Sequence, residues 1–475
     1  MRYMKRTWSL LIFAVLTGVN LYSQHYSAIH GSNYSGSLGV YNNPSSIVNV
    51  PYKWDLTLFG AQFQTISNAV TGRNFPSYFS GSDYEAKQGN FIRKADVNVN
   101  LHLLNARYSI SQKKAIAFGL NFRSNLQLAT SPVNYHDSIV STSSFLEVNQ
   151  LYQHLNARFA GSAWMEVYGT YAFTLWDQES SRLNAGVTLK FLKGMSGGFV
   201  ELNNVNINKQ QQADETLYTI ANGDAKYGYS SNHGDASSFD LSDLFGGSKA
   251  GFAVDLGVEY LVKSQELTTV YDDVTYNDYD WKIGVSLLDL GANNFTYGSE
   301  SRSVASLKED VSGRVLNEKF HDVKNLSSFN DSLATIVGET NALTGNFSIM
   351  NPARAVVNVD RYLTGNFYLN GELSVNLIPE SSKKLALRET KLLTITPRWE
   401  TRRLGVYLPF EYTTRGNFWV GAALKAGPLL VGTHNLLNAF APNKTLGGGA
   451  YIALIIRPWK ESSQGRNKQY DCPPY

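Results

Sequence analysis

The sequence predicts an all-β fold: a transmembrane antiparallel up-and-down β-barrel of about 14 strands, within a range of roughly 12 to 16. Apolar and polar residues alternate over segments as long as a membrane-crossing strand, and longer than the average soluble strand. Aromatic residues reach 13% and charged residues only 17%, with 39 Gly and 28 Tyr, a composition typical of strands and turns. The chain also begins with the layout of an export signal.

The pattern of residues 1–24 predicts export. Three basic residues precede an apolar run at Trp8–Leu16, and a more polar stretch ends at Gln24. The apolar run is shorter than the roughly 20 residues that a membrane-spanning helix needs. We therefore expect residues 1–24 to be a cleaved signal peptide. Their removal lowers the formal charge from +3 to zero.

Composition excludes several classes of protein. No apolar run after the signal approaches 18 residues, which excludes a helical membrane protein. Basic residues are scattered on a neutral mature chain, so no nucleic-acid partner is expected. The single cysteine, Cys472, rules out an internal disulfide framework, and we interpret it as an unpaired thiol in a tail.

The clearest alternation lies in residues 115–129. Even positions from Ile116 to Leu128 are apolar except for Ser124, and the odd positions are small or polar. The same pattern recurs around residues 97–103, 186–191, 254–260, 281–287, 367–377 and 404–411. Since glycines and charges share the polar face, this face suits a wet lumen better than a dry sandwich core.

The strand pattern gives an alternation of long and short connections. We predict strands near residues 54–67, 94–111, 114–129, 161–176, 182–195, 250–263, 279–291, 353–362, 366–378, 390–400, 403–413, 417–426, 428–435 and 447–458. With a periplasmic N-terminus, the long connections fall outside and the short ones inside, as in outer-membrane barrels. Two places stay open: 196–208 could continue a strand or form an extra hairpin, and 264–278 is long for a periplasmic turn.

The domain plan follows from these strands. We expect a signal peptide at 1–24, a plug-like or hatch-like segment at 25–53, the barrel at 54–459 and a periplasmic tail at 460–475. The long outer loops lie near 196–249 and 292–352, the second with a partly helical stretch from Leu307 to Lys324. Loops of this length are either functional or disordered, and both alternatives stay open.

The inward face carries charges of both signs. The candidate lumen-lining residues are Asn121, Arg123, Lys190, Asp255, Glu259, Lys282, Glu372, Arg398 and Glu411. They could line a polar channel or bind the head group of an amphipathic solute. The alternative is that they pair with one another and fill the lumen structurally.

Catalysis and metal binding find little support. The eight histidines show no metal-ligand spacing, and no phosphate-binding loop or nucleophile elbow is present. The acidic tract Tyr271–Asp280 lacks the glycine and final glutamate of a calcium loop, so we interpret it as a solvated turn. We expect no enzyme, no cofactor and no metal site, although a hydrolase with a lone Ser and His on the barrel wall would leave no signature.

Several short motifs carry a family resemblance. A turn at Asn43, Pro44 and Ser45 precedes the first strand, and glycine-rich strand motifs follow at Gly251–Tyr260, Gly284–Gly291, Gly405–Pro409 and Ala426–Gly432. In order and spacing these resemble an uncharacterised family of Bacteroidota outer-membrane barrels related to the long-chain fatty acid transporter superfamily. The resemblance implies a 14-stranded barrel whose N-terminal segment enters the lumen as a plug. Ser45 departs from the Asn-Pro-Ala pattern of that superfamily, and no ligand transfers with the fold.

Two functions are therefore expected for an outer-membrane barrel. The first is passive transport of a hydrophobic or amphipathic small molecule, with residues 25–50 in the lumen. The second is a closed barrel that presents its long outer loops to a secretion-system component, a secreted cargo or a glycan. Outer-membrane lipid and the barrel-assembly machinery are the expected partners in both. An exported soluble β-protein remains a third possibility.

Overall fold

The structure is a computed structural model. It describes residues 26–72, 84–150, 154–211, 216–232, 249–264, 279–307, 311–323, 325–436 and 447–458. The expected signal peptide, the tail at 460–475 with Cys472, and most of the connection at 264–278 lie outside these residues.

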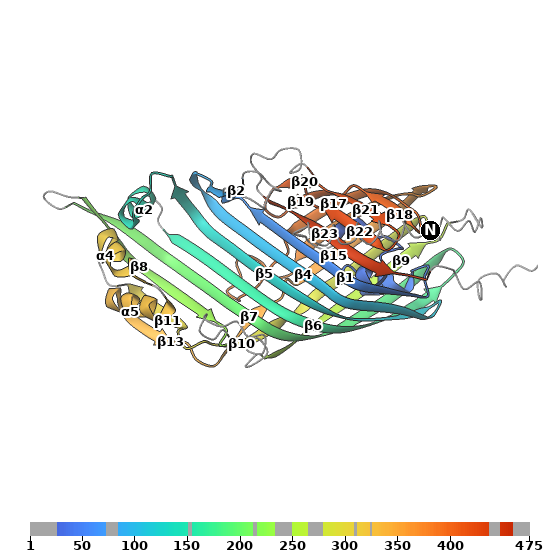
Figure 1. The fold of residues 1–475 in the computed structure, drawn as a ribbon, viewed down its shortest axis with the longest axis horizontal. Coiled ribbons are helices and arrows are strands. Elements are labelled where there is room, and N and C mark those ends of the chain that lie inside the picture. The colour runs from blue at the N-terminus through green and yellow to red at the C-terminus, as the bar shows by residue number, and fades with distance from the viewer. Residues whose placement is uncertain are drawn as a thin grey trace, which may run out of the picture.

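The sheet closes on itself. The first strand, β1 (Trp54–Ser67), pairs antiparallel with β4 (Gly89–Ser111) on one side and with the last strand, β23 (Gly447–Ile456), on the other. Fourteen strands form this closed antiparallel barrel, which confirms the predicted fold class (Figure 1).

The other wall strands follow one another in chain order. They are β5 (Lys114–Tyr135), β6 (Leu155–Asp177), β7 (Ser181–Gln211), β9 (Ala250–Val262), β10 (Trp281–Thr296), β15 (Arg354–Thr364), β16 (Phe367–Asn376), β17 (Lys391–Glu400), the pair β18 (Leu404–Tyr407) and β19 (Phe410–Thr413), the pair β20 (Phe418–Val420) and β21 (Ala422–Ala426), and β22 (Leu429–Thr433). β18 and β19 together form one wall strand with a single interruption, and so do β20 and β21. The interruptions fall at Pro409, which has no N–H to donate, and at Gly421.

The wall is apolar outside and polar inside, the reverse of a soluble protein. On β5, Phe118 is 56% exposed whereas Asn121 is fully buried; on β9, Phe252 is 68% exposed whereas Asp255 is fully buried. Neighbouring side chains on a strand point to opposite faces, so the exposed apolar set must face outward. Such a surface is stable against lipid and not against water. Among the described residues, no helix is long and apolar enough to cross a bilayer.

A second group of elements extends the wall at the end of the barrel where β4 begins and β7 ends. β7 runs on to Gln211 and forms a hairpin with β8 (Thr216–Tyr229), so the region predicted as an outer loop at 196–249 is largely a strand hairpin. The region 292–352 supplies β11 (Arg302–Leu307), β12 (Val311–Ser312), β13 (Val337–Ala342), β14 (Asn346–Met350), α4 (Gly313–Phe320) and α5 (Leu326–Ile336). With α2 (Thr142–Asn149) these helices gather at the end of the molecule far from the start of β1 (Figure 1). A small hairpin, β2 (Val70–Gly72) with β3 (Tyr84–Ala86), follows β1.

Residues 26–52 lie inside the barrel. They form three short 3-10 helices, η1 (Ser27–Ile29), η2 (Gly36–Tyr41) and η3 (Pro44–Val48). Their apolar side chains pack against small and aromatic residues on the inner face of the wall. The segment therefore occupies the lumen at the end of the barrel where β1 begins and β4 ends.

Candidate functional site

The turn at Asn43, Pro44 and Ser45 is held by local capping. The Asn43 side chain accepts hydrogen bonds from the Ser45 backbone N–H at 3.0 Å and from its hydroxyl at 2.7 Å. Pro44 takes the first position of η3, where a missing N–H costs nothing. These interactions explain why Asn-Pro-Ser forms a helix start at this point of the chain.

This turn packs against glycines of three neighbouring strands, β7, β9 and β10. A Cβ atom on Gly186 of β7 would lie 2.6 Å from backbone atoms of Pro44 and Ser45, and one on Gly257 of β9 would overlap the Asn43 side chain. A Cβ on Gly284 of β10 would lie 2.8 Å from the same side chain. Only glycine leaves room for the backbone of the turn to approach the wall so closely.

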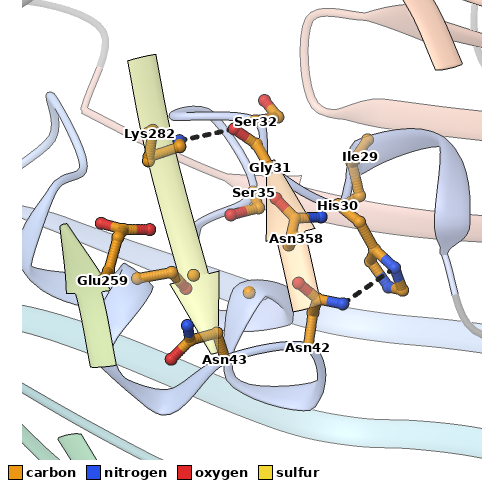
Figure 2. Close-up of a pocket in the computed structure, with 13 residues that line it drawn as sticks. Ile29, His30, Gly31, Ser32, Ser35, Asn42, Asn43, Glu259, Lys282 and Asn358 are labelled. Carbon is orange, nitrogen blue, oxygen red and sulfur yellow. Dashed lines mark hydrogen bonds between the residues drawn. The ribbon is translucent and has the colours of Figure 1, made fainter. Parts of the chain in front are cut away.

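Polar side chains of the wall bind the segment at its middle. Glu372 of β16 accepts from Asn42 at 2.6 Å, and its carboxylate lies 2.7 Å from His30 Nδ1. Lys282 of β10 donates to the Gly31 carbonyl at 2.5 Å and to Asn33 at 2.8 Å. Figure 2 shows His30 and Asn42 facing each other, with Lys282 reaching across to the segment.

Further contacts fix residues 26–52 toward the end of the barrel where β1 begins. Ser32 donates to the Glu400 carboxylate, with its Oγ 2.8 and 3.0 Å from the two oxygens. Arg107 donates to the carbonyls of Ile47 and Tyr52 at 2.7 and 2.8 Å. Burial raises the pKa of Tyr26 far above its ordinary value, so its hydroxyl stays protonated. This hydroxyl donates to the Ile452 carbonyl of β23 at 3.2 Å.

A buried ionic cluster lies farther along the lumen. Asp289 of β10 accepts from Arg123 at 2.8 Å, from Lys190 at 2.7 Å and from Arg354 at 3.1 Å. Lys190 also pairs with Asp255 at 2.7 Å. We call this group the Asp289 cluster; its members join β5, β7, β9, β10 and β15 through their side chains.

The nine predicted lumen-lining residues are all buried and therefore face inward. The structure brings them into separate groups. Arg123, Lys190 and Asp255 belong to the Asp289 cluster, and Asn121 reaches it through Glu166 at 3.0 Å. Lys282 and Glu372 bind residues 26–52, and Glu259 lines the cavity beside them. Arg398 pairs with Asp360, and the Glu411 carboxylate lies 3.3 Å from His434 Nδ1.

The sequence prediction missed several inward charges, among them Arg107, Glu166 and Glu400 described above and three more on β10 and β15. Asp289, Arg354 and Asp360 are at most 4% exposed and each forms an ion pair in the lumen. Strand parity alone places Asp289 on the outward face with Leu287. A β-bulge between residues 287 and 290, with a positive φ of 56° at Asp289, turns that side chain inward. Arg354 and Asp360 alternate with Val357 in a pattern that was readable on β15.

A small cavity remains between the segment and the wall. His30, Asn42 and Asn43 line one side of it, with Lys282 and Glu259 on the other (Figure 2). It has room for about a single water molecule, so it is not a passage in this state. Among the described residues, no group of three or more His, Cys, Asp or Glu could hold a metal ion.

Comparison with known proteins gives one family and several distant structures. The model of a family described as a family of unknown function (DUF5723) matches residues 44–434. No curated protein sequence matches the chain.

Among solved structures, the toluene transporter TbuX of Ralstonia pickettii is 11% identical over 88% of this chain and 92% of its own, with a TM-score of 0.36. A FadL homologue of Pseudomonas aeruginosa is 10% identical over 92% and 98%, with a TM-score of 0.38. The P. putida toluene transporter TodX is 9% identical over 89% and 93%, with a TM-score of 0.36. Likenesses of this size carry no argument, and the fold rests on the strand pairing described above.

Proposed function

The chain belongs to the family of unknown function DUF5723, and we propose that it is an outer-membrane barrel that admits a hydrophobic or amphipathic small molecule by passive transport. In this proposal residues 25–50 close the lumen and must move for the molecule to pass. Outer-membrane lipid surrounds the barrel, which the assembly machinery inserts after export.

The way the N-terminal segment is held carries this proposal. No described residue of 26–52 pairs with the wall as a strand. Its polar anchors are separate hydrogen bonds to charged side chains such as Glu372, Lys282 and Arg107, each worth about 1.5 to 3 kcal/mol net, and not a continuous strand ladder. A segment held this way can leave without unzipping the barrel.

The chemistry of the remaining lumen favours an amphipathic solute. Trp164, Phe199, Phe295 and Phe347 form an apolar cluster inside the wall. The Arg123 guanidinium lies 5.1 Å from the Trp164 ring, so cationic and apolar surfaces meet. A solute with an apolar body and a polar group finds a partner for each part.

Deletion of residues 25–50 behind the intact export signal tests the proposal. Reconstituted in planar bilayers, the deletion variant is expected to show discrete conductance steps, whereas the full chain stays closed. Gel mobility with and without boiling confirms that the variant still folds as a barrel. A correctly folded deletion variant that remains silent contradicts the proposed passage.

A second function is favoured by the order of the outer extension. Val304, Leu333, Ile336 and Val337 form an apolar core between β11, α5 and β13, so this part presents a defined surface. That surface suits display to a secretion-system component, a cargo or a glycan. Pull-down from detergent extracts, with and without residues 302–342, tests display, and an unchanged set of bound partners removes its basis.

A further inference from the structure

The connection between β16 and β17 folds into the lumen from the outer side. Within residues 378–390, which we call the outer strap, Leu387 is 1% exposed and Ala386 2%. Leu387 packs into the apolar cluster beside Trp164 and Phe347, and Leu385 packs against its edge. The strap therefore fills the apolar surface that a solute would otherwise contact.

Short backbone and amide contacts hold the root of the strap. Met350 donates to the Leu385 carbonyl at 2.9 Å, and Leu387 donates to the Met350 carbonyl at 3.0 Å. The Gln127 side chain bonds both the N–H and the carbonyl of Arg388. Residues 388–390 are held further, because Asn376 donates to the Glu389 carbonyl at 2.9 Å and Arg354 pairs with the Glu389 carboxylate at 3.5 Å. Within the strap, Ala386 alone takes part in a β-bridge, so residues 380–387 are not part of a strand ladder.

The tip of the strap is held by exposed ion pairs. Glu380 is 65% exposed at its side chain and lies 3.1 Å from Lys94 and 3.9 Å from Arg415. Exposed pairs of this kind contribute little, because water and salt screen them. Arg158 adds hydrogen bonds to the carbonyls of Ser382 and Lys384. The tip therefore adds little to the hold on the strap, and the hydrogen bonds of Leu385 and Leu387 with Met350 are the contacts that opening must break.

We propose that the outer strap is a second gate, which closes the lumen at the end opposite to residues 26–52 and opens by withdrawing Leu385 and Leu387 from the apolar cluster. This inference rests on the proposed function, because a gate has meaning only if something passes. With two closures at opposite ends, loss of one leaves the passage under the control of the other.

A reversible tether tests the gate. Met350 and Ala386 form a parallel β-bridge, whose close backbones suit a disulfide. The double variant Met350→Cys/Ala386→Cys is made in a chain that lacks residues 25–50 and carries Cys472→Ser, so no other thiol is present. The matched control is Asn294→Cys/Ser348→Cys, which joins β10 to β14 at paired positions and leaves the strap free.

In planar bilayers, the reduced strap variant is expected to conduct, the oxidised variant to lose its conductance, and reductant to restore it. The control pair should conduct equally in both states. Equal conductance of the oxidised and reduced strap variant overturns the gate and leaves the proposed passage intact. If both are silent and deletion of 380–386 restores conductance, the strap is a fixed closure and the gate is also overturned. Silence after that deletion, in a folded barrel, contradicts the passage itself.

Discussion

Gly186→Val is expected to displace residues 26–52 from the lumen and to raise the open fraction of the barrel about 5- to 150-fold. The Cβ of any larger residue would meet Pro44 and Ser45 at 2.6 Å, and both contacts are with backbone, which cannot swing aside as a side chain can. Overpacking of this kind costs about 1 to 3 kcal/mol. Valine is itself favourable in a strand, so the wall should tolerate it.

Bilayer conductance and protease cleavage of residues 26–52 measure this effect together. The matched control is Gly169→Val on β6, where an added Cβ meets no atom within 4 Å. The control should remain closed and resistant to protease. If Gly186→Val also remains closed and resistant, the Asn-Pro-Ser turn does not rest on this wall.

Asp289→Asn should lower the free energy of unfolding of the barrel by about 3 to 5 kcal/mol. The substitution removes the shared carboxylate of Arg123, Lys190 and Arg354 and leaves three buried cations with too little countercharge. Asparagine keeps the shape of the side chain and tolerates the positive φ of this position, so charge is the main change.

Urea unfolding in detergent, followed by the loss of heat-resistant gel mobility, measures this difference. Asp331→Asn on the exposed side of α5 is the matched control and should change stability by no more than about 0.5 kcal/mol. An Asp289→Asn barrel as stable as the control would mean that the Asp289 cluster does not hold the wall together.

The wall was predictable because one physical rule governs it. Lipid outside and polar groups inside impose a two-residue period on every strand, as residues 115–129 show, and this period located all the wall strands. The rule fails where the backbone departs from regular geometry. The bulge at Asp289 reverses which residues of β10 face inward from that point on. No sequence feature near Leu288 predicts this bulge.

The segments that fill the lumen, residues 26–52 and the outer strap, were less predictable than the wall strands. The turn at Asn43 and the glycines opposite it were visible separately, but their contact joins residues over 140 positions apart, and periodicity carries no such information. The outer strap has no repeating pattern, since Leu385 and Leu387 stand between charged residues. The hairpin of β7 and β8 was one of two alternatives, because the alternation ends where polar residues occupy both faces at 208–211.

Every lumen contact depends on a barrel that closes in a membrane, and gel mobility of the full chain tests this most directly. The protein is expressed with its export signal, the outer-membrane fraction is isolated, and samples are run in detergent with and without boiling. We expect the chain in that fraction, with the unboiled sample migrating faster because the closed barrel stays compact. Recovery in the soluble fraction with identical mobility before and after boiling would contradict the barrel and the gated lumen together.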